Sequence, residues 1–337
     1  MVVLITGSAG YIGSHVAQWL IKEGRDFIGL DNLHRGMMEN NRGPLVVGDI
    51  RRIEDIRQVF DEVESQGNKI DAVIHMAALT SVPESMTNKD EYEEVNLDGT
   101  KNLIQVMKEH NCNKLVFSST ASVYRQSNEP VREIDPIEPL NNYALTKYQA
   151  EQFIKENKDW LNAVIFRYFN VIGYADDYDK STEFAKTNII PALIRTLSSG
   201  ETFKVFGNGH PVKRNNPEDH TCVRDYIDVR DIARAHGDAL KYLENNEGQH
   251  LFNLGTKIGY SVLELLNAFE KANNLKVNYE IVGPRKGDPA SVVANNQKAH
   301  ELLHWCPLTP LEVSLNVTNA IKEDDFCECC CADDKGC

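Results

Sequence analysis

The segment Thr6-Gly7-Ser8-Ala9-Gly10-Tyr11-Ile12-Gly13 decides the fold of this chain. It follows an apolar run, Val2–Thr6, that is typical of a strand, and it opens a helical pattern near Tyr11–Lys22. Glycines at such a junction permit a tight turn and let the backbone approach a pyrophosphate at the positive end of the helix. The spacing is G-x-x-G-x-x-G rather than G-x-G-x-x-G, but the strand–helix context predicts a dinucleotide-binding turn.

The first half of the chain repeats this alternation of strand and helix. Further strands are expected at Phe27–Asp31, Leu45–Val47, Ala72–His75, Lys114–Ser118 and Ala163–Arg167. Further helices are expected near Ile53–Ser65, Glu93–His110 and Asn142–Lys155. The pattern predicts an α/β fold with a doubly wound parallel sheet of the Rossmann type, and ligands at the carboxyl ends of its strands.

The composition changes after Asn170, where Gly, Pro, Asn and Asp become frequent, and this predicts a smaller mixed α/β substrate-binding region. Two stretches, Tyr226–Val229 with the helix after it and His250–Asn253, return to the pattern of the first half. We therefore expect an NAD-binding domain of residues 1–170 plus 224–256, a substrate region of residues 171–223 plus 257–322, and an acidic, Cys-rich tail at 323–337.

Bulk properties narrow the class of protein. The chain has 337 residues, of which 42% are hydrophobic and 26% charged, as in soluble globular proteins. The net charge of −14 argues against a nucleic-acid partner, because phosphates need a basic surface. No apolar run is long enough to span a membrane, and a strand follows Met1 at once, which leaves no room for a signal peptide. These features predict a cytoplasmic protein.

The tail is rich in cysteine. Cysteines stand at Cys327, Cys329, Cys330, Cys331 and Cys337, but their spacing fits no standard zinc pattern and no histidine accompanies them. The flanks are acidic and hydrophilic, so we expect a disordered, non-catalytic tail and assign no metal site. Binding of a soft metal by this cluster is the alternative.

Tyr143 and Lys147 are the strongest candidates for catalysis. Spaced i and i+4 on an expected helix, their side chains share one face. A phenol holds its proton to about pH 10, and a nearby ammonium lowers that pKa toward the range where proton transfer is efficient. The hydroxyl-bearing strand end Ser118-Ser119-Thr120 precedes the pair by about two dozen residues and adds weight to it.

Acidic residues at the ends of the second and third strands indicate which cofactor is bound. Asp31 ends the second strand, where a carboxylate accepts hydrogen bonds from the ribose and repels a 2′-phosphate. This favours NAD over NADP, although Arg35 lies close enough to oppose that preference. Asp49-Ile50, after the third strand, suits contacts to adenine, and an N-cap role for Asp49 is an equal alternative.

Small residues follow the fourth strand in His75-Met76-Ala77-Ala78-Leu79, where a cofactor can lie across the sheet edge. His75 itself is expected to be packed or hydrogen-bonded for structural reasons. Asn96, in the next helix, either positions the cofactor or the backbone of the site, or satisfies buried polar groups.

These motifs together resemble the extended short-chain dehydrogenases/reductases, and within them the UDP-glucose (UDP-galactose) 4-epimerases. The more specific blocks are Arg167-Tyr168-Phe169-Asn170, Val223-Arg224-Asp225-Tyr226-Ile227 and Arg285-Lys286-Gly287-Asp288. The resemblance covers residues 1 to about 320. It implies a homodimeric isomerase of galactose metabolism with tightly bound NAD, which interconverts UDP-hexoses through a transient 4-keto sugar.

The resemblance also implies residue roles. Tyr143 takes the proton of the sugar 4-hydroxyl, Lys147 lowers the pKa of that phenol and binds the nicotinamide ribose, and Thr120 hydrogen-bonds the reacting oxygen. The cofactor-binding set is Gly7, Gly10, Tyr11, Ile12, Gly13, Asp31, Asn32, Asp49, Ile50, Ala77, Ala78, Leu79, Asn96, Ser118, Tyr143, Lys147 and Phe169. The substrate-binding set is Thr80, Ser81, Thr120, Asn170, Asn188, Ile189, Val205, Phe206, Arg224, Arg285, Asp288 and Val292. Arg224 and Arg285 are the fork-shaped donors that a diphosphate requires.

Three departures from the family concern substrate choice or loop length. Thr80 stands where well-known members have lysine, Val292 stands where a tyrosine often closes the sugar pocket, and the loop from Gly209 to Cys222 is long. Small residues at the first two positions predict that UDP-GlcNAc and UDP-GalNAc are accepted as well.

Other functions stay open to different degrees. A 4,6-dehydratase needs an acid pair after the central threonine, but here Ala121-Ser122 follow Thr120, so that function is rejected. A dehydrogenase that releases NADH lacks a sign of a second substrate. An epimerase dedicated to UDP-N-acetylhexosamines and a catalytically silent NAD-binding sensor or scaffold are the alternatives, and the intact Tyr143, Lys147 and Thr120 oppose the silent protein.

Overall fold

The structure, a computed structural model, describes residues 1–174, 188–207, 219–283 and 289–317. Its largest element is a seven-stranded sheet, parallel throughout, in the order β10-β6-β5-β4-β1-β2-β3. The strands are β1 Val2–Thr6, β2 Asp26–Asp31, β3 Leu45–Val47, β4 Ile70–His75, β5 Lys114–Thr120, β6 Asn162–Tyr168 and β10 Gln249–Leu254. The strand order reverses between β1 and β4, and ligands of open α/β sheets bind outside the strand ends at such a point.

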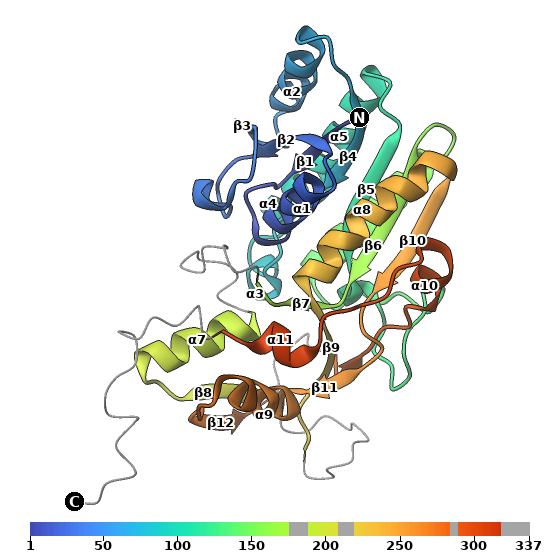
Figure 1. The fold of residues 1–337 in the computed structure, drawn as a ribbon. Coiled ribbons are helices and arrows are strands. Elements are labelled where there is room, and N and C mark those ends of the chain that lie inside the picture. Colours follow the sequence, from blue (N-terminus) through green and yellow to red (C-terminus); the bar gives the residue numbers. More distant parts are fainter. Residues whose placement is uncertain (175–187, 208–218, 284–288, 318–337) are drawn as a thin grey trace, which may run out of the picture.

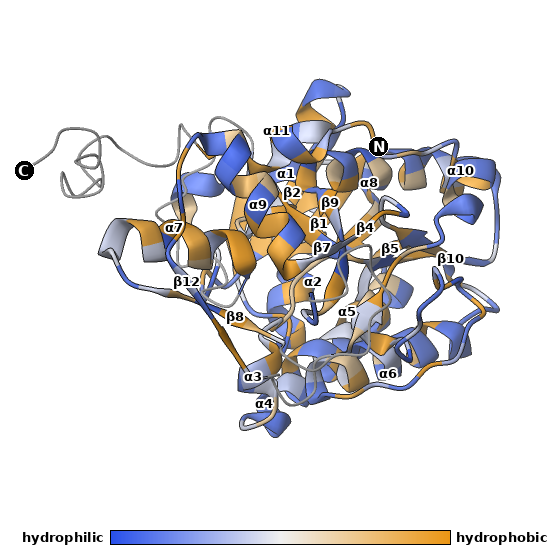
Figure 2. Ribbon diagram, turned by 90° about the horizontal axis from the view of Figure 1, so that it is seen from below, coloured by the Kyte–Doolittle hydropathy of each residue, from blue (hydrophilic) through white to orange (hydrophobic). Residues whose placement is uncertain are grey.

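Helices cover both faces of this sheet, as its uninterrupted apolar strands require. On one face α1 packs against α8, and on the other α2 packs against α5 beside α6 (Figure 1). The bounds are α1 Tyr11–Lys22, α2 Ile53–Ser65, α5 Gly99–Glu109, α6 Asn142–Glu156 and α8 Val229–Asn245. Hydrophobic residues gather along the central strands, and hydrophilic ones on the outward turns of the helices (Figure 2). The predicted fold class is confirmed.

One expected helix is divided. The pattern at Glu93–His110 predicted a single element, but the chain forms α4 Lys89–Glu93, a π-helical turn η2 Glu94–Asp98 and then α5. A π-turn interrupts the helix for a single turn, and the apolar spacing within the two flanking helical segments does not mark where that turn lies. The turn carries Asn96, whose side chain is fully engaged at the site described below.

A smaller region lies beyond the carboxyl ends of the large sheet (Figure 1). It contains a four-stranded sheet of β7 Asn170–Ile172, β9 Val223–Asp228, β11 Gly259–Ser261 and β13 Ser291–Val292, and a two-stranded sheet of β8 Phe203–Phe206 and β12 Tyr279–Val282. Its helices are α7 Ile189–Ser199, α9 Val262–Asn273 and α11 Leu311–Leu315, and the short elements elsewhere are η1 Met38–Asn40, α3 Val82–Ser85, η3 Ala121–Val123 and α10 Gln297–Leu303. Their side chains form a separate apolar core around Leu193, Leu265 and Phe269.

The expectation that Tyr226–Val229 rejoins the main-domain pattern is wrong for the strand and right for the helix after it. Strand β9 pairs with β7, β11 and β13 in the smaller sheet, whereas α8 packs on the large sheet against α1. An apolar strand buried on both faces does not reveal its partners, because the pattern is the same in either sheet. His250–Asn253 lies in β10 of the large sheet, as expected. The division into domains stays a prediction.

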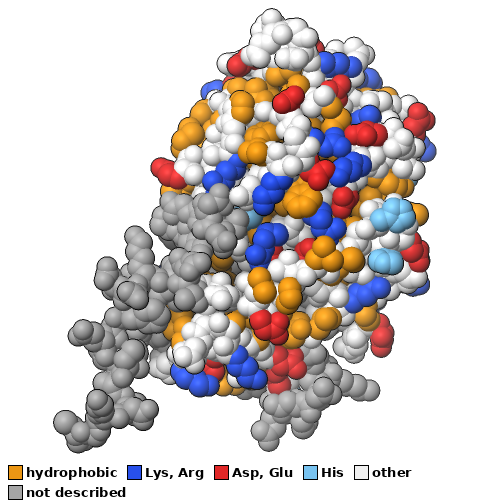
Figure 3. Space-filling view, viewed as in Figure 1, with side chains coloured by type: hydrophobic (Ala, Val, Ile, Leu, Met, Phe, Trp, Pro, Cys, Tyr) orange, Lys and Arg blue, Asp and Glu red, His pale blue; other side chains and the backbone are white. Residues whose placement is uncertain are grey.

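Within the described ranges, no helix combines the length and the apolar character needed to cross a bilayer. On the face shown in Figure 3, acidic and basic side chains are interspersed. Cys112 and Cys306 are free thiols. The Cys-rich tail lies outside the described residues.

Candidate active site

A cavity of about 1030 Å³ opens at the carboxyl ends of the large sheet and extends to α7, β8 and β9 of the smaller region. It brings together most of the predicted site residues from both halves of the chain. The predicted residues that line it are Gly7, Gly10, Tyr11, Ile12, Gly13, Ala78, Thr80, Ser81, Ser118, Thr120, Tyr143, Lys147, Phe169, Asn170, Asn188, Ile189, Phe206 and Arg224.

Other predicted residues lie outside the lining of this cavity, which is formed by the described part of the chain. They are Asp31, Asn32, Asp49, Ile50, Ala77, Leu79, Asn96, Val205 and Val292. The Val205 side chain is fully buried in the core of the smaller region, which leaves only its backbone for a ligand. Val292 is buried in the same apolar cluster as Ala121 and Phe169, two residues that line the cavity. Arg285 and Asp288 lie outside the described residues.

The glycine turn is built for close backbone packing. Gly7 has φ +74°, and a Cβ there would lie 2.7 Å from the Ala77 nitrogen. A Cβ on Gly13 would lie 2.0 Å from the Gly7 carbonyl oxygen, so α1 can begin this close to β1 only with glycine. Gly10 is the N-cap of α1, and the first turn of that helix faces the cavity. This cradle fits a dinucleotide pyrophosphate at the positive helix end.

Asp31 ends β2 beside that turn. Its carboxylate accepts hydrogen bonds from the Ala9 N–H at 3.0 Å and the Leu33 N–H at 2.8 Å. Burial raises the pKa of Asp31, and these two backbone donors oppose the rise. A Cβ on Gly36 would lie 2.9 Å from both carboxylate oxygens, so the chain passes directly over the carboxylate there.

Asp49 does not cap α2, since the N-cap is Arg52, and the alternative offered for it is wrong. Its carboxylate accepts hydrogen bonds from Asn32 Nδ2 at 3.0 Å and from the Arg51 guanidinium, which lowers the pKa of Asp49. Helix α2 begins three residues later than an Asp49 cap would place it, and Asp55 accepts the Asp49 N–H instead. The contact of Asp49 and Ile50 with adenine stays a prediction.

His75 and Asn96 support the site from behind. His75 is buried between Thr6 Oγ1 at 2.7 Å and Thr100 Oγ1 at 2.9 Å, and burial lowers its pKa to about 3. The expected structural role of His75 is confirmed. Asn96 accepts the Leu79 N–H at 2.9 Å and donates to the Leu79 carbonyl at 3.0 Å, so it fixes the backbone beside the cavity.

Helix α6 places Tyr143 and Lys147. Its N-cap Asn141 accepts the Ala144 N–H at 2.9 Å, so Tyr143 lies in the first turn and Lys147 one turn later. Both side chains line the cavity together with Thr120, the last residue of β5. The Lys147 ammonium lies 4.3 Å from the centre of the Phe117 ring. The expected common face of the pair is confirmed.

The pKa values of the pair differ from the expectation. Burial raises the pKa of Tyr143 to about 12, and hydrogen bonding to Thr120 opposes the rise. Burial lowers the pKa of Lys147 to about 7, while the charge of Glu151 opposes that fall. In the chain alone, loss of solvation is the larger effect on the Tyr143 pKa, and the lowering of that pKa by Lys147 stays a prediction.

Two buried networks that the sequence did not reveal flank this pair. On the α6 side of β5, Ser119 donates to Glu151, which also accepts from Arg167 Nε at 2.9 Å and Nη2 at 2.6 Å. On the α8 side, Ser118 Oγ lies 2.9 Å from the Tyr168 hydroxyl, which lies 2.6 Å from His236 Nε2. The spacing of Glu151 four residues after Lys147 is the signal that could have found the first network.

The far end of the cavity is formed by the smaller region. Arg224 reaches it from β9 and donates to the Val223 carbonyl at 2.9 Å. Lys204, Cys222 and Tyr226 also line this end and were not predicted. A guanidinium here suits a nucleotide diphosphate.

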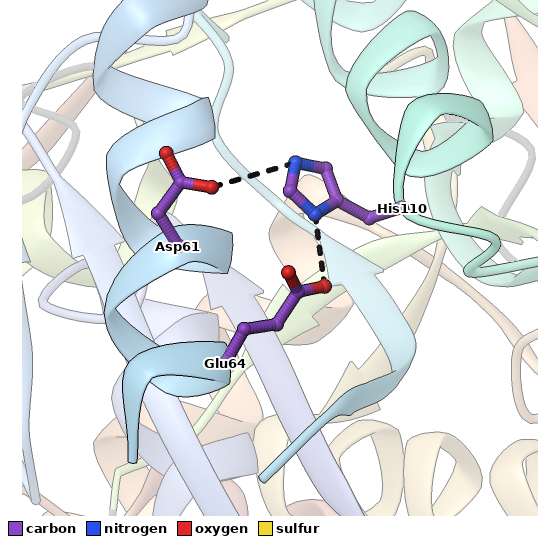
Figure 4. Close-up of side chains that lie close together, drawn as sticks. All are labelled: Asp61, Glu64 and His110. Carbon is purple, nitrogen blue, oxygen red and sulfur yellow. Dashed lines mark hydrogen bonds and ion pairs between the residues drawn. The ribbon is translucent and has the colours of Figure 1, made fainter. Parts of the chain in front are cut away.

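A second cluster of titratable side chains lies away from the cavity (Figure 4). Glu64 Oε1 lies 2.9 Å from His110 Nδ1, and Asp61 Oδ1 lies 4.0 Å from His110 Nε2. The His110 ring also packs on Phe60 at 4.9 Å between centroids. These contacts join α2 to the end of α5, as does the ion pair of Arg57 with Glu109, so the cluster is accounted for by helix packing.

Comparison with known proteins decides the family. Residues 3–255 match the NAD dependent epimerase/dehydratase family. The chain belongs to this family. A curated relative, the UDP-glucose 4-epimerase of Lactobacillus helveticus, is 37% identical over 315 residues, which is 91% of this chain and 92% of that protein.

Solved structures of family members agree. The UDP-glucose 4-epimerase of Stenotrophomonas maltophila, with bound NAD and formylated UDP-arabinopyranose, has a TM-score of 0.87 and 32% identity over 95% of this chain and 97% of that one. The UDP-Glc/GlcNAc 4-epimerase of Campylobacter jejuni has a TM-score of 0.79 and 30% identity over 96% and 99%. Membership confirms the resemblance stated from sequence, the fold class and NAD as the cofactor.

Proposed function

We propose that this chain is an isomerase that interconverts UDP-glucose and UDP-galactose at C4 with NAD held in the cavity. The observation that carries the proposal is the meeting of Tyr143, Thr120 and Lys147 in a cavity whose far end presents Arg224. A base and its partner at one end and a guanidinium at the other suit a sugar nucleotide that is anchored by its diphosphate. The curated relatives carry this activity in their names.

Each residue of the site has a separate role in the proposed reaction. Tyr143 accepts the proton of the 4-hydroxyl, and Thr120 orients that oxygen. When bound, NAD would supply the acceptor for the C4 hydride and a further positive charge. Burial raises the pKa of Tyr143, so the positive charge that bound NAD would add to that of Lys147 would favour loss of the phenol proton. A site that grips the diphosphate and leaves the sugar room to turn serves both epimers.

Changing Tyr143→Phe tests the proposal. The variant keeps its shape and its ability to bind NAD but loses proton transfer, which contributes about 10²–10⁴-fold to turnover. We expect that loss in kcat for conversion of UDP-galactose, read out with a glucose-specific assay. Tyr148→Phe on the same helix is the matched control, because Tyr148 does not line the cavity. Activity of Tyr143→Phe near that of the unaltered protein would contradict the assignment, and no conversion by the unaltered protein would favour the silent NAD-binding alternative.

We propose that the acetylated pair, UDP-GlcNAc and UDP-GalNAc, is accepted too. Val292 belongs to the same buried cluster as Ala121 and Phe169, which line the cavity, and a small side chain at that position leaves more room for a 2-acetamido group than a tyrosine would. Thr80 and Ser81 add short hydroxyl side chains to the lining. Changing Val292→Tyr should lower kcat/KM mainly for the acetylated pair, with the unacetylated pair as the internal control. Equal loss for both pairs, or strong discrimination by the unaltered protein, would contradict this.

We also propose a cytoplasmic homodimer. Support for the dimer comes from Leu140 and Leu145, which are 42% and 41% exposed at the start of α6 and leave apolar surface there to be covered. Light scattering should give twice the chain mass, and Leu145→Glu should shift it toward the monomer. Support for the compartment comes from the free thiols of Cys112 and Cys306, which persist in a reducing environment; fractionation of cells that express the protein tests it.

A further inference from the structure

Arg35 lies where it could affect the choice between NAD and NADP. It follows Asp31 by four residues, in the region where an arginine binds the 2′-phosphate of NADP, and it lines the cavity. We infer that Glu84 engages Arg35 and thereby makes the site select NAD over NADP, so that Glu84 is a determinant of cofactor specificity. The inference concerns nucleotide choice alone and holds or fails independently of which sugar is the substrate.

The contact that carries the inference crosses the cofactor end of the cavity. Arg35 Nη2 donates to Glu84 Oε2, and the two residues come from different loops, after β2 and in α3 after β4. Both line the same cavity. The guanidinium fork is thus directed at the opposite wall, whereas binding a 2′-phosphate needs it directed at the ribose.

Glu84 is itself held in place. The Tyr92 hydroxyl lies 3.2 Å from Glu84 Oε2 and 2.7 Å from the Ser81 carbonyl oxygen. Tyr92 is fully buried, so it anchors the carboxylate at a fixed position beside α3. Glu84 is therefore the fixed member of the ion pair. The Arg35 side chain, which is 44% exposed, is the less constrained member.

The charges of these side chains also disfavour NADP. Glu84 in the cavity lining and Asp31, buried behind it, contribute two negative charges, and Arg35 contributes one positive charge. A 2′-phosphate carries about −1.5 to −2 at neutral pH, so it meets a site that is already negative in sum. An exposed ion pair contributes little to stability, so its consequence here is for the ligand rather than for the fold. Removing the Glu84 charge leaves the site neutral and releases Arg35.

The test is nucleotide content rather than turnover. Purified holoprotein is incubated with equal concentrations of NAD and NADP until exchange is complete, freed of unbound nucleotide and denatured, and the released nucleotides are quantified by mass spectrometry. We expect the unaltered protein to hold NAD, and Glu84→Gln to raise the NADP-to-NAD ratio about tenfold, the size of a charge-assisted hydrogen bond gained. Glu39→Gln, an exposed glutamate of the loop after β2, is the matched control and should leave the ratio unchanged.

Two further variants fix the mechanism. Adding Arg35→Gln to Glu84→Gln should return the ratio to that of the unaltered protein, because the released guanidinium is what binds the phosphate. A gain that survives in this double variant would overturn the role of Arg35, and no gain in Glu84→Gln would show that Asp31 alone selects NAD. Glu84→Ser serves if Glu84→Gln folds poorly: the same rise in the ratio would support the inference, and an unchanged ratio would overturn it.

Discussion

The two faces of strand β5 carry different hydrogen-bond networks beside the active site, one charged and one neutral. Ser119 faces α6 and enters a network of full charges with Glu151 and Arg167, all buried. Ser118, its neighbour, faces α8 and enters a neutral chain with Tyr168 and His236, also buried. Because consecutive strand residues point to opposite faces, one dipeptide couples the site to both layers of helices.

The neutral chain has a definite direction. His236 Nδ1 lies 2.9 Å from the Ile232 carbonyl, which only accepts, so Nδ1 carries the proton and Nε2 accepts from Tyr168. Tyr168 therefore accepts from Ser118, and the Ser118 hydroxyl proton points away from the cavity. The charged network has another consequence, since Glu151 opposes the burial-driven fall in the Lys147 pKa. The charged face thus controls protonation at the site, while the neutral face controls the direction of hydrogen bonds.

Breaking the charged network should have the largest effect. Glu151→Gln leaves the Arg167 charge buried without its partner, so we expect a loss of about 3–5 kcal/mol in the free energy of unfolding. Urea denaturation measures it. Glu156→Gln, an exposed position on the same helix, is the control and should change stability little. A double variant, Glu151→Leu with Arg167→Met, should recover much of the loss, because no unpaired charge remains.

The same variant should alter the pH profile of turnover. Without the Glu151 charge, the Lys147 pKa falls below its value of about 7, so the ammonium is lost at lower pH. The alkaline fall in kcat should move to lower pH in Glu151→Gln. A destabilised but otherwise unchanged site would keep its pH profile, and that outcome would restrict Glu151 to a structural role.

Breaking the neutral chain should cost less. Tyr168→Phe removes one hydroxyl and leaves His236 Nε2 without its donor, a loss of about 1–3 kcal/mol in the free energy of unfolding. The exposed Tyr279→Phe is the matched control in the same denaturation experiment. A loss in the free energy of unfolding as large as that of Glu151→Gln would contradict the expected difference between the charged and the neutral network.

What the sequence predicted well was local. The bounds of α1 and α2 were predicted as the structure has them, because apolar side chains recur along each helix with its own period. The glycine turn and the pair of Tyr143 and Lys147 were equally local, each set by spacing within about two turns. These elements needed no knowledge of the partners they pack against.

What the sequence did not predict depends on pairing between distant segments. Ser119 and Arg167 are partners because β5 lies beside β6 with these residues in register, and alternation alone does not supply that register. Strand β9 was expected beside the large sheet for the same reason. The contact of Arg35 with Glu84 joins two loops whose approach depends on the order of β2, β1 and β4.

The smallest effect that we expect is a loss of stability at acid pH caused by protonation of His236, which belongs to the neutral network. Burial lowers the pKa of His236 to about 4, below its value of about 6.5 in an unfolded chain. Between these values the unfolded state binds the extra proton, so stability is complete above about pH 6.5 and falls as the pH decreases, by up to about 1.4 kcal/mol per pH unit. Buried His75, whose pKa is lowered to about 3, adds an equal contribution in this range, so denaturation between about pH 6.5 and pH 5 should show both, and His236→Gln should remove one of them. The exposed His300→Gln is the control. An unchanged slope in His236→Gln would mean that the neutral chain tolerates a charged imidazole, which the direction assigned to its hydrogen bonds forbids.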